Sequence, residues 1–284
     1  MRGVRTRRSK PTGRTFGLIV IGVLCAFALF GSALSPHDPN DQDIGARLKG
    51  PSFDHWLGTD HLGRDVASRL IAGTRVGLTL GLPVVLIALA IGLSIGLASG
   101  YRRGRADLLT LFFIDFLAAF PGLILALVLI PLLGVSTRTL ILVLVVAFVP
   151  GYVRVTRASV LGVKERGFVL AERALGASSW RITSRHILPN IIGPILILAA
   201  IDIPVVIVAE AGLSFLGLGV PPPDPSWGSM LFEGFSRVRD APGPVLWPAA
   251  AIAITTIAFT LLGESFSSGR EMEVVETTRQ SQVT

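Results

Sequence analysis

Three acidic residues interrupt otherwise apolar stretches of this sequence: Asp115, Asp202 and Glu210. An acid at the centre of a bilayer costs ~2.5 to 3.5 kcal/mol on insertion scales, so it usually faces a bundle interior or a water-filled cavity. We therefore expect these residues to line a translocation path that could accept an ammonium group or another cation. A buried hydrogen bond to a neighbouring helix, or protonation of the acid, would satisfy them without any role in transport.

A second group of potential ligands lies in the polar segment between residues 36 and 75. Histidine and carboxylate side chains close together could bind a metal ion. The glycines at positions 58 and 63 instead favour a tightly folded loop on the membrane surface. We therefore expect no metal site and no cofactor. The residues concerned are His55, Asp60, His61 and Asp65.

The sequence lacks the motifs of common enzymatic sites. It has no H-E-x-x-H and no Walker A sequence. The stretch from Ala200 to Ile203 lacks the G-x-G-D expected of an intramembrane aspartyl enzyme, and the single cysteine, Cys25, excludes an intramolecular disulfide. We expect no enzymatic activity, and any ATP must be hydrolysed by another chain.

The composition indicates that lipid surrounds most of this chain. Of 284 residues, 51% are hydrophobic and 16% are charged, and the mean hydropathy is +0.65. This is more apolar surface than one soluble domain of this length can bury. The net charge of +7 could indicate nucleic-acid binding, but in a membrane protein basic residues first report orientation. We expect membrane lipid, and no nucleic acid, as a partner.

Six apolar runs are long enough to cross a ~30 Å hydrocarbon layer as helices. The first follows a basic tail and lacks a signal-peptide cleavage site, so it should be an uncleaved span. Small residues along the second run should let another helix approach closely. Prolines interrupt later runs, so those helices should be buried in a bundle. The expected spans are 16–34, 76–100, 108–133, 139–155, 191–218 and 245–263.

The distribution of basic residues predicts how these spans are oriented. With the N-terminus inside, 18 of the 26 lysines and arginines fall in cytoplasmic segments, as the positive-inside rule requires. Both termini should lie in the cytoplasm of a bacterial cell, with the protein in its inner membrane. The expected parts are a basic tail (1–15), a first span with an external amphipathic loop (16–75), a five-helix core (76–268) with a cytoplasmic loop (153–188), and a cytoplasmic tail (269–284).

The cytoplasmic stretch from Gly167 to Asn190 resembles the EAA loop of importer permeases. It matches the glycine of that loop at Gly176, its central alanine, and the spacing of thirteen residues to Pro189. Its acid, Glu172, lies two positions late. The resemblance implies a short helix that docks into a groove on an ATPase subunit. It assigns this contact to Ala171, Glu172, Gly176, Ala177, Trp180, Arg181, Leu188 and Pro189.

The residues of this stretch also allow a simpler interpretation. A basic loop lying on anionic lipid headgroups would explain the arginines equally well. It would not explain Trp180 or the Leu-Pro ending. Small side chains follow Gly176, so this glycine should either adopt a positive φ or let a partner approach the backbone closely.

Two further stretches resemble the C-type permease subunit of dipeptide, oligopeptide and nickel importers. The stretch from His55 to Arg69 is similar to H-x-L-G-T-D-x-x-G-R-D-x-x-S-R, and the stretch from Ala209 to Val220 is similar to the fifth span of that subunit. The resemblance implies an all-α permease with six transmembrane helices and a cytoplasmic coupling helix. Its implied partners are a second permease subunit, two ATP-binding subunits and an extracytoplasmic solute-binding protein.

The function implied by this resemblance is ATP-driven import of peptides or similar small solutes. Closure of the ATPase subunits would move the coupling helix and rock the spans, giving alternating access. A self-sufficient secondary transporter or channel is the alternative, but neither inverted repeats nor a filter ring is visible. The solute cannot be identified from this chain, because the solute-binding protein selects it first.

Overall fold

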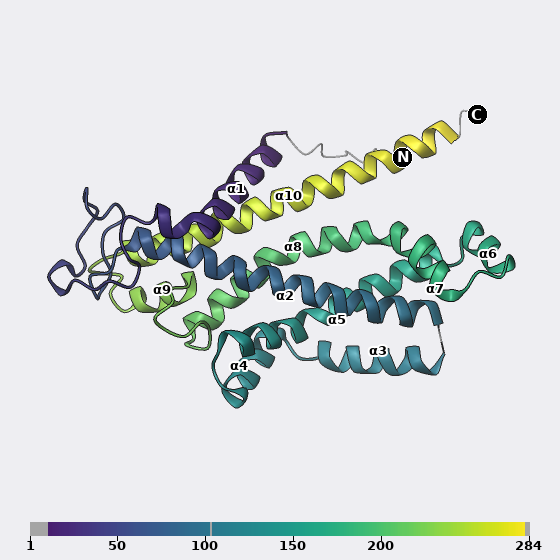
Figure 1. The fold of residues 1–284 in the computed structure, drawn as a ribbon, viewed down its shortest axis with the longest axis horizontal. Coiled ribbons are helices and arrows are strands. Elements are labelled where there is room, and N and C mark those ends of the chain that lie inside the picture. Colours follow the sequence, from purple (N-terminus) through teal and green to yellow (C-terminus); the bar gives the residue numbers. More distant parts are fainter. Residues whose placement is uncertain (1–10, 103, 282–284) are drawn as a thin grey trace, which may run out of the picture.

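The chain folds as a bundle of long helices that run roughly along one axis (Figure 1). The computed structural model describes residues 11–102 and 104–281. All named secondary-structure elements in these residues are helices, which confirms the all-α fold class. Residues 1–10 of the expected basic tail lie outside this part. The helices are α1 (Pro11–Leu34), α2 (Val66–Arg102), α3 (Arg105–Ala118), α4 (Gly122–Leu133), α5 (Thr137–Val163), α6 (Gly167–Ala174), α7 (Ser179–Arg181), α8 (Leu188–Phe215), α9 (Trp227–Phe235) and α10 (Gly243–Ser281).

Five helical segments are each long and apolar enough to cross a membrane: α1, α2, α5, the region from α7 through α8, and α10. The expected span at 108–133 is instead a bent pair, in which α3 and α4 meet at 84°. Pro121 precedes α4 with φ −56° and ψ 126°, and a proline disfavours helical geometry in the residue before it. The described chain crosses six times if the bent pair counts as one span.

Helix α2 begins ten residues before the expected span, at Val66 rather than residue 76. The Asp65 carboxylate accepts a hydrogen bond from the Ser68 backbone N–H at 2.8 Å, which satisfies a free donor in the first turn of the helix. This cap starts the helix in the polar loop, so its first turns project beyond the apolar run. Helix α10 is also longer than expected, because it continues to Ser281 through most of the predicted tail.

The central contact of the bundle is between α2 and α5, and the small residues of α2 make it possible. A Cβ atom built on Gly92 would lie 2.3 Å from the Tyr152 Cβ, and one on Gly96 would lie 2.6 Å from the Thr156 Cβ. Only glycine allows the backbones this close. The expected close approach along the second run is therefore confirmed, with α5 as the neighbouring helix. Helix α8 packs against both α2 and α5, and α1 packs against α10.

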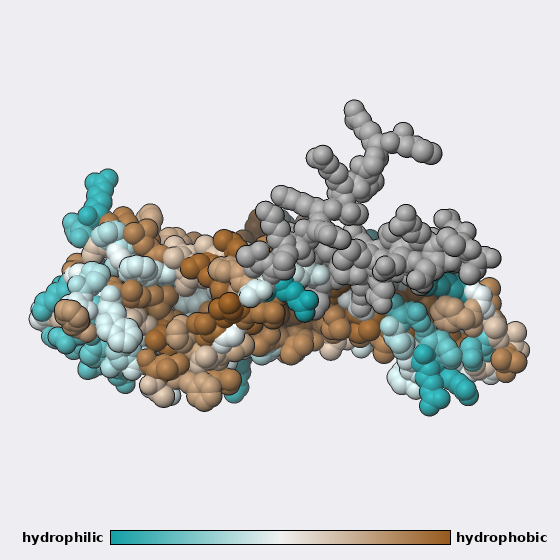
Figure 2. Space-filling model, turned by 90° about the horizontal axis from the view of Figure 1, so that it is seen from above, coloured by the Kyte–Doolittle hydropathy of each residue, from teal (hydrophilic) through white to brown (hydrophobic). Residues whose placement is uncertain are grey.

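The surface has the layered polarity of a membrane protein. On the face that Figure 2 shows, apolar side chains form a broad band across the middle and polar side chains gather toward the two ends. Helix α9 and the loops before α2 lie at one end, while α6, α7 and the end of α10 lie at the other (Figure 1). The two polar ends therefore carry different structures, and each is described separately below.

Candidate functional site

The segment at one polar end presents apolar side chains to solvent. Helix α6 is anchored inward by Val169, which is fully buried, and the following π-helical segment Ile182–Ile187 is anchored by its two isoleucines. On the outer side, Leu175 is 82% exposed and Trp180 is 80% exposed. We call the exposed side chains of this segment the coupling patch; it consists of Phe168, Leu170, Leu175 and Trp180.

Gly176 forms the turn that places α6 beside α7. Its φ is +79°, and the backbone N–H groups of Ala177 and Gly176 donate to the carbonyls of Glu172 and Arg173, each at 3.1 Å. This is the Schellman arrangement that ends a helix with a left-handed glycine. No atom lies within 4 Å of a Cβ built on Gly176, so conformation rather than space requires the glycine. Of the two alternatives expected for Gly176, the structure shows the positive φ.

Charged side chains connect residues 164–187, which we call the coupling segment, to the spans. The Lys164 ammonium is buried and donates to the carbonyl oxygens of Gly100 and Tyr101, at 2.8 and 3.2 Å. These carbonyls belong to the last turn of α2, where a cation is favourable. The Arg173 guanidinium lies 5.8 Å from the centroid of the Tyr101 ring. A displacement of α6 would therefore act directly on the last turn of α2.

The acid of the coupling segment is paired within the segment itself. His186 Nε2 lies 3.6 Å from Glu172 Oε2, which links α6 to the π-helical turn before α8. Ala171 and Arg181 are exposed near the coupling patch, and Ala177 is half-buried. Leu188 and Pro189 lie at the first two positions of α8 and therefore start that helix. The expected coupling residues thus divide into an exposed surface and the helix start behind it.

Two of the three acids expected on the translocation path lie against α5. Asp115, on α3, is 2.7 Å from the Arg154 guanidinium of α5, and the side chains of this pair are 62% and 51% exposed. Asp202, on α8, is half-buried and interacts electrostatically with the buried Tyr152 hydroxyl, although the geometry between them is not that of a hydrogen bond. Asp115 and Arg154 are therefore an exposed ion pair between α3 and α5, and Arg154, which was expected in the cytoplasmic loop, lies within helix α5.

The third acid, Glu210, is only 2% exposed and reaches no open surface in this conformation. The Ser214 hydroxyl donates to its carboxylate at 2.5 Å, and the Val220 backbone N–H donates to that hydroxyl at 3.3 Å. The carboxylate also interacts with Ser226, the N-cap of α9. Glu210 thus holds the end of α8 against α9, which is the hydrogen-bonding alternative considered for these acids.

Sequence reasoning missed a further acid, Asp107, because the expected spans left it in a loop. It lies in the first turn of α3. Arg157 donates to both of its carboxylate oxygens at 2.7 Å, and the Ser99 hydroxyl donates to one of them. Asp107 therefore links α3 to α2 and α5. The signal that could have found it is Arg157, because an arginine packed within a helical bundle needs an acidic partner.

At the opposite polar end, the motif from His55 to Arg69 builds an ion-pair network. Arg64 Nε lies 2.6 Å from Asp60 Oδ2, and the other end of its guanidinium donates to Glu233 on α9. The nearly buried Arg69 guanidinium lies 3.3 Å from Glu233 and 3.6 Å from Asp60. The motif therefore fastens the loop before α2 to α9. Glu233 lies far from it in sequence and was not singled out.

Replacing Glu233 with glutamine is expected to lower the melting temperature of the purified chain. Two guanidiniums would then share Asp60 alone, and breaking a buried pair from one side costs about 3 kcal/mol. Asp240→Asn, at an exposed acid of the same end, is the matched control and should leave the melting temperature unchanged. Equal melting temperatures for the two variants would contradict the stabilising role of the network.

These features define a polytopic, helical membrane protein with an exposed apolar patch at one end and a folded cap at the other. The chain belongs to the family described as binding-protein-dependent transport system inner membrane component, whose model matches residues 78–268. A second model, the N-terminal TM domain of oligopeptide transport permease C, matches residues 12–51. The resemblance to the C-type permeases is thereby confirmed, and the chain is the permease subunit of an ABC importer.

Individual relatives and solved structures agree. The chain is 39% identical over 249 residues to the glutathione transport system permease protein GsiD of Pectobacterium atrosepticum, which covers 87% of this chain and 82% of the relative. It is 36% identical over 271 residues to the protein of the same name from Escherichia coli, which covers 95% and 89%. These relatives are permeases, not catalytic subunits.

The fold matches inward-facing structures of the MetNI methionine ABC transporter. Two crystal forms superpose with TM-scores of 0.56 and 0.58 at 18% identity. They cover 70% and 69% of this chain, and 96% and 93% of the matched chains. At this identity the match establishes the fold of an ABC importer subunit.

Proposed function

We propose that this chain forms one half of a translocation path for small peptides, glutathione-like compounds included, in the bacterial inner membrane. The other half is a second permease subunit. Two ATP-binding subunits hydrolyse ATP on the cytoplasmic side, and an extracytoplasmic solute-binding protein delivers the solute. The names of the relatives at 39% and 36% identity support the peptide class.

The observation that carries the coupling proposal is the exposure of Trp180 and Leu175 at a polar end of the molecule. Large apolar side chains that project into water are typical of a protein-binding surface, and tryptophan is enriched among residues that dominate binding energy. Lipid headgroups would explain exposed arginines, but they do not require the rigid turn at Gly176. We assign the coupling patch to a groove on an ATP-binding subunit.

The proposed orientation places the coupling patch and both termini in the cytoplasm. The end of α10 lies at the same end of the molecule as α6 and α7 (Figure 1), in support of this arrangement. The cap formed by α9 and the loops before α2 would then face the solute-binding protein. Reporter fusions after Ser178 should be cytoplasmic, and fusions after Asp240 should be external.

The exposed pair of Asp115 and Arg154 is proposed to face the translocation path. Neither a carboxylate nor a guanidinium is tolerated against lipid, so the pair must face water or protein. An acid and a base side by side can bind the ammonium and carboxylate groups of a zwitterionic peptide. Asp202 lies on the neighbouring α8 and is half-buried, and we propose that it contributes to the same path.

The experiment that tests this function is purification of the tagged chain from its native membrane, followed by identification of its partners and reconstitution with them. We expect two ATP-binding subunits and one further permease per complex. Uptake of glutathione or a dipeptide should require ATP and the solute-binding protein. Transport by the chain without ATP-binding subunits would instead support a secondary transporter or channel.

A further inference from the structure

Two histidines and an aspartate meet at the external end of the molecule. His37 follows α1, His55 lies in the loop before α2, and Asp65 caps α2. Ligand atoms of the three side chains all lie within 4.8 Å of one another. The two imidazole rings are 4.8 Å apart between centroids and tilted by 36°. The loops thus bring together side chains that are far apart in the sequence.

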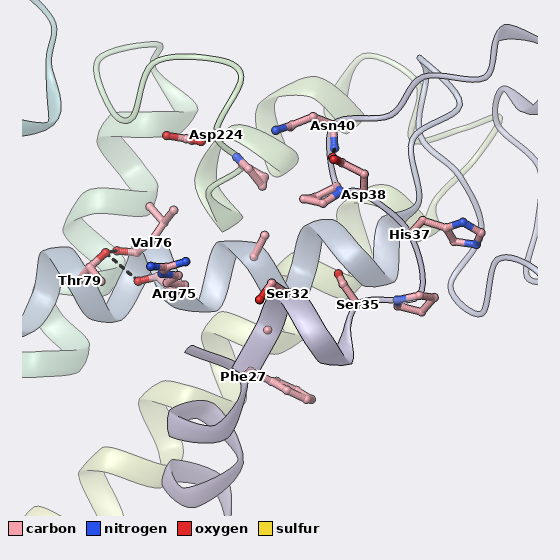
Figure 3. Close-up of a pocket in the computed structure, with 15 residues that line it drawn as sticks. Phe27, Ser32, Ser35, His37, Asp38, Asn40, Arg75, Val76, Thr79 and Asp224 are labelled. Carbon is pink, nitrogen blue, oxygen red and sulfur yellow. Dashed lines mark hydrogen bonds between the residues drawn. The ribbon is translucent and has the colours of Figure 1, made fainter. Parts of the chain in front are cut away.

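The hydrogen bond of His37 determines which of its ring nitrogens is free. His37 Nε2 lies 2.7 Å from the backbone carbonyl oxygen of Asp54. A carbonyl oxygen can only accept, so Nε2 must carry the hydrogen. In the neutral ring, Nδ1 therefore keeps its lone pair. The imidazole also points away from the neighbouring cavity, toward the external loop (Figure 3).

The hydrogen bond of His55 likewise determines which of its ring nitrogens is free. His55 Nδ1 lies 3.0 Å from Asp65 Oδ1, and a carboxylate oxygen accepts, so Nε2 keeps the lone pair of the neutral ring. The other oxygen of Asp65 is held by the Ser68 N–H and hydroxyl, at 2.8 and 2.7 Å. A carboxylate that fixes the tautomer of a histidine is the usual outer-shell partner of a metal-binding imidazole.

We propose that His37 and His55 bind a late first-row divalent metal ion such as Zn²⁺. Nδ1 of His37 and Nε2 of His55 supply the protein ligands, Asp65 orients His55, and water completes the coordination. Zinc–nitrogen bonds of ~2.0–2.1 Å require the two nitrogens to be roughly 3.3 Å apart in a tetrahedral site. The exposed His37 side chain can rotate to meet this distance because it lies on a loop.

The sequence predicted no metal site, because the glycines at positions 58 and 63 favoured a folded loop. Its candidate group of His55, Asp60, His61 and Asp65 did not include His37. The structure separates that group into two clusters. In the second cluster, Asp60 and Glu233 are already neutralised by the guanidiniums of Arg64 and Arg69, so a cation is not expected there. Burial also lowers the pKa of His61, although Asp60 partly opposes this effect.

The bound metal would join the segment after α1 to the loop before α2. His37 also borders a cavity of about 750 Å³ whose lining includes Arg75 and Asp224, shown in Figure 3. Because the His37 ring points away from this cavity, the metal would fix one wall of the cavity without filling it. The metal would therefore hold the segment after α1 and the loop before α2 together.

The test is titration of the full chain, purified in detergent without a polyhistidine tag, with Zn²⁺ and with Co²⁺ as a spectroscopic probe. The wild type should bind one ion with micromolar or tighter affinity, and Zn²⁺ should raise its melting temperature. His37→Ala and His55→Ala should each weaken binding at least tenfold. His61→Ala and His186→Ala should bind as the wild type does.

The His37→Ala variant keeps the test decisive if His55→Ala fails to fold, because the His37 side chain is exposed and its hydrogen bond to the Asp54 carbonyl lies at the surface. Unchanged Co²⁺ absorption and Zn²⁺ affinity in His37→Ala would overturn the proposal. Failure of the wild type to bind Zn²⁺ at micromolar concentration would overturn it as well.

Discussion

A chain in which Leu175 and Trp180 are both changed to aspartate is expected to insert and fold normally but to lose its ATP-binding subunits. The side chains are 82% and 80% exposed, so their replacement removes almost no packing within the chain. In an interface, truncation of one dominant residue costs about 2 kcal/mol or more, and two new negative charges add to this loss. We expect the affinity of the ATP-binding subunits for this chain to fall at least 100-fold, so that they no longer co-purify with it.

The measurements are the stoichiometry of the purified complex and its solute-stimulated ATP hydrolysis. The matched control is Phe53→Asp with Trp56→Asp, which replaces two exposed aromatic residues at the opposite end. This control should retain both ATP-binding subunits. Full ATPase activity in the Leu175 and Trp180 variant would favour the interpretation in which the basic loop lies on lipid headgroups.

The fold class, the five unbroken spans and the turn at Gly176 could be predicted from the sequence, because each depends on local composition. Apolar runs identify spans whatever they pack against, and a glycine followed by small residues predicts a turn at Gly176 that the structure confirms. The small-residue run of α2 likewise predicted a close helix neighbour. The sequence did not show that this neighbour is α5, since Tyr152 and Thr156 lie far along the chain.

The bent pair of α3 and α4 was not predicted, although Pro121 was visible. Seven prolines interrupt the apolar runs, and six of them lie inside helices: Pro83, Pro131, Pro150, Pro194, Pro204 and Pro248. Whether a proline breaks a helix depends on how its neighbours satisfy the freed backbone groups. That is a property of the packed bundle, and a single sequence does not contain it.

The roles of the charged residues were also only partly predictable. Hydropathy identified Asp115, Asp202 and Glu210 as acids that need partners, but not what those partners are. The structure gives Glu210 a serine hydroxyl and Asp115 an arginine. Glu233 and Asp107 were missed because an acid near the end of an apolar run carries no insertion cost that would mark it. Their arginine partners lie far from them in the sequence, so only the structure shows these ion pairs.

The pair of Asp115 and Arg154 gives the second large expected effect. Side chains that are 62% and 51% exposed form a salt bridge worth about 1 kcal/mol or less. Each charge would cost ~2.5 to 3.5 kcal/mol at the centre of a bilayer, so the pair should face a water-filled path rather than lipid. In water its attraction contributes little to stability, and we propose that the pair instead contacts a charged solute.

Asp115→Asn is therefore expected to raise the KM for dipeptides at least tenfold, because the solute loses the partner of its ammonium group. Uptake of N-acetylated dipeptides should change much less, since they carry no ammonium. The measurement is uptake by the reconstituted importer over a range of solute concentrations. The matched control is Asp107→Asn, which removes the acid of the buried pair with Arg157 and should lower the melting temperature without altering this preference.

A charge exchange distinguishes contact with the solute from a merely structural pair. In the double variant Asp115→Arg with Arg154→Asp, the ion pair can reform with opposite polarity. If the pair only joins α3 to α5, the exchange should restore wild-type uptake. If the carboxylate and the guanidinium bind the two ends of a peptide, uptake should stay low because both ends of the solute meet a like charge. A third result, loss of the second permease from the complex, would place the pair in the permease interface and contradict the proposed path.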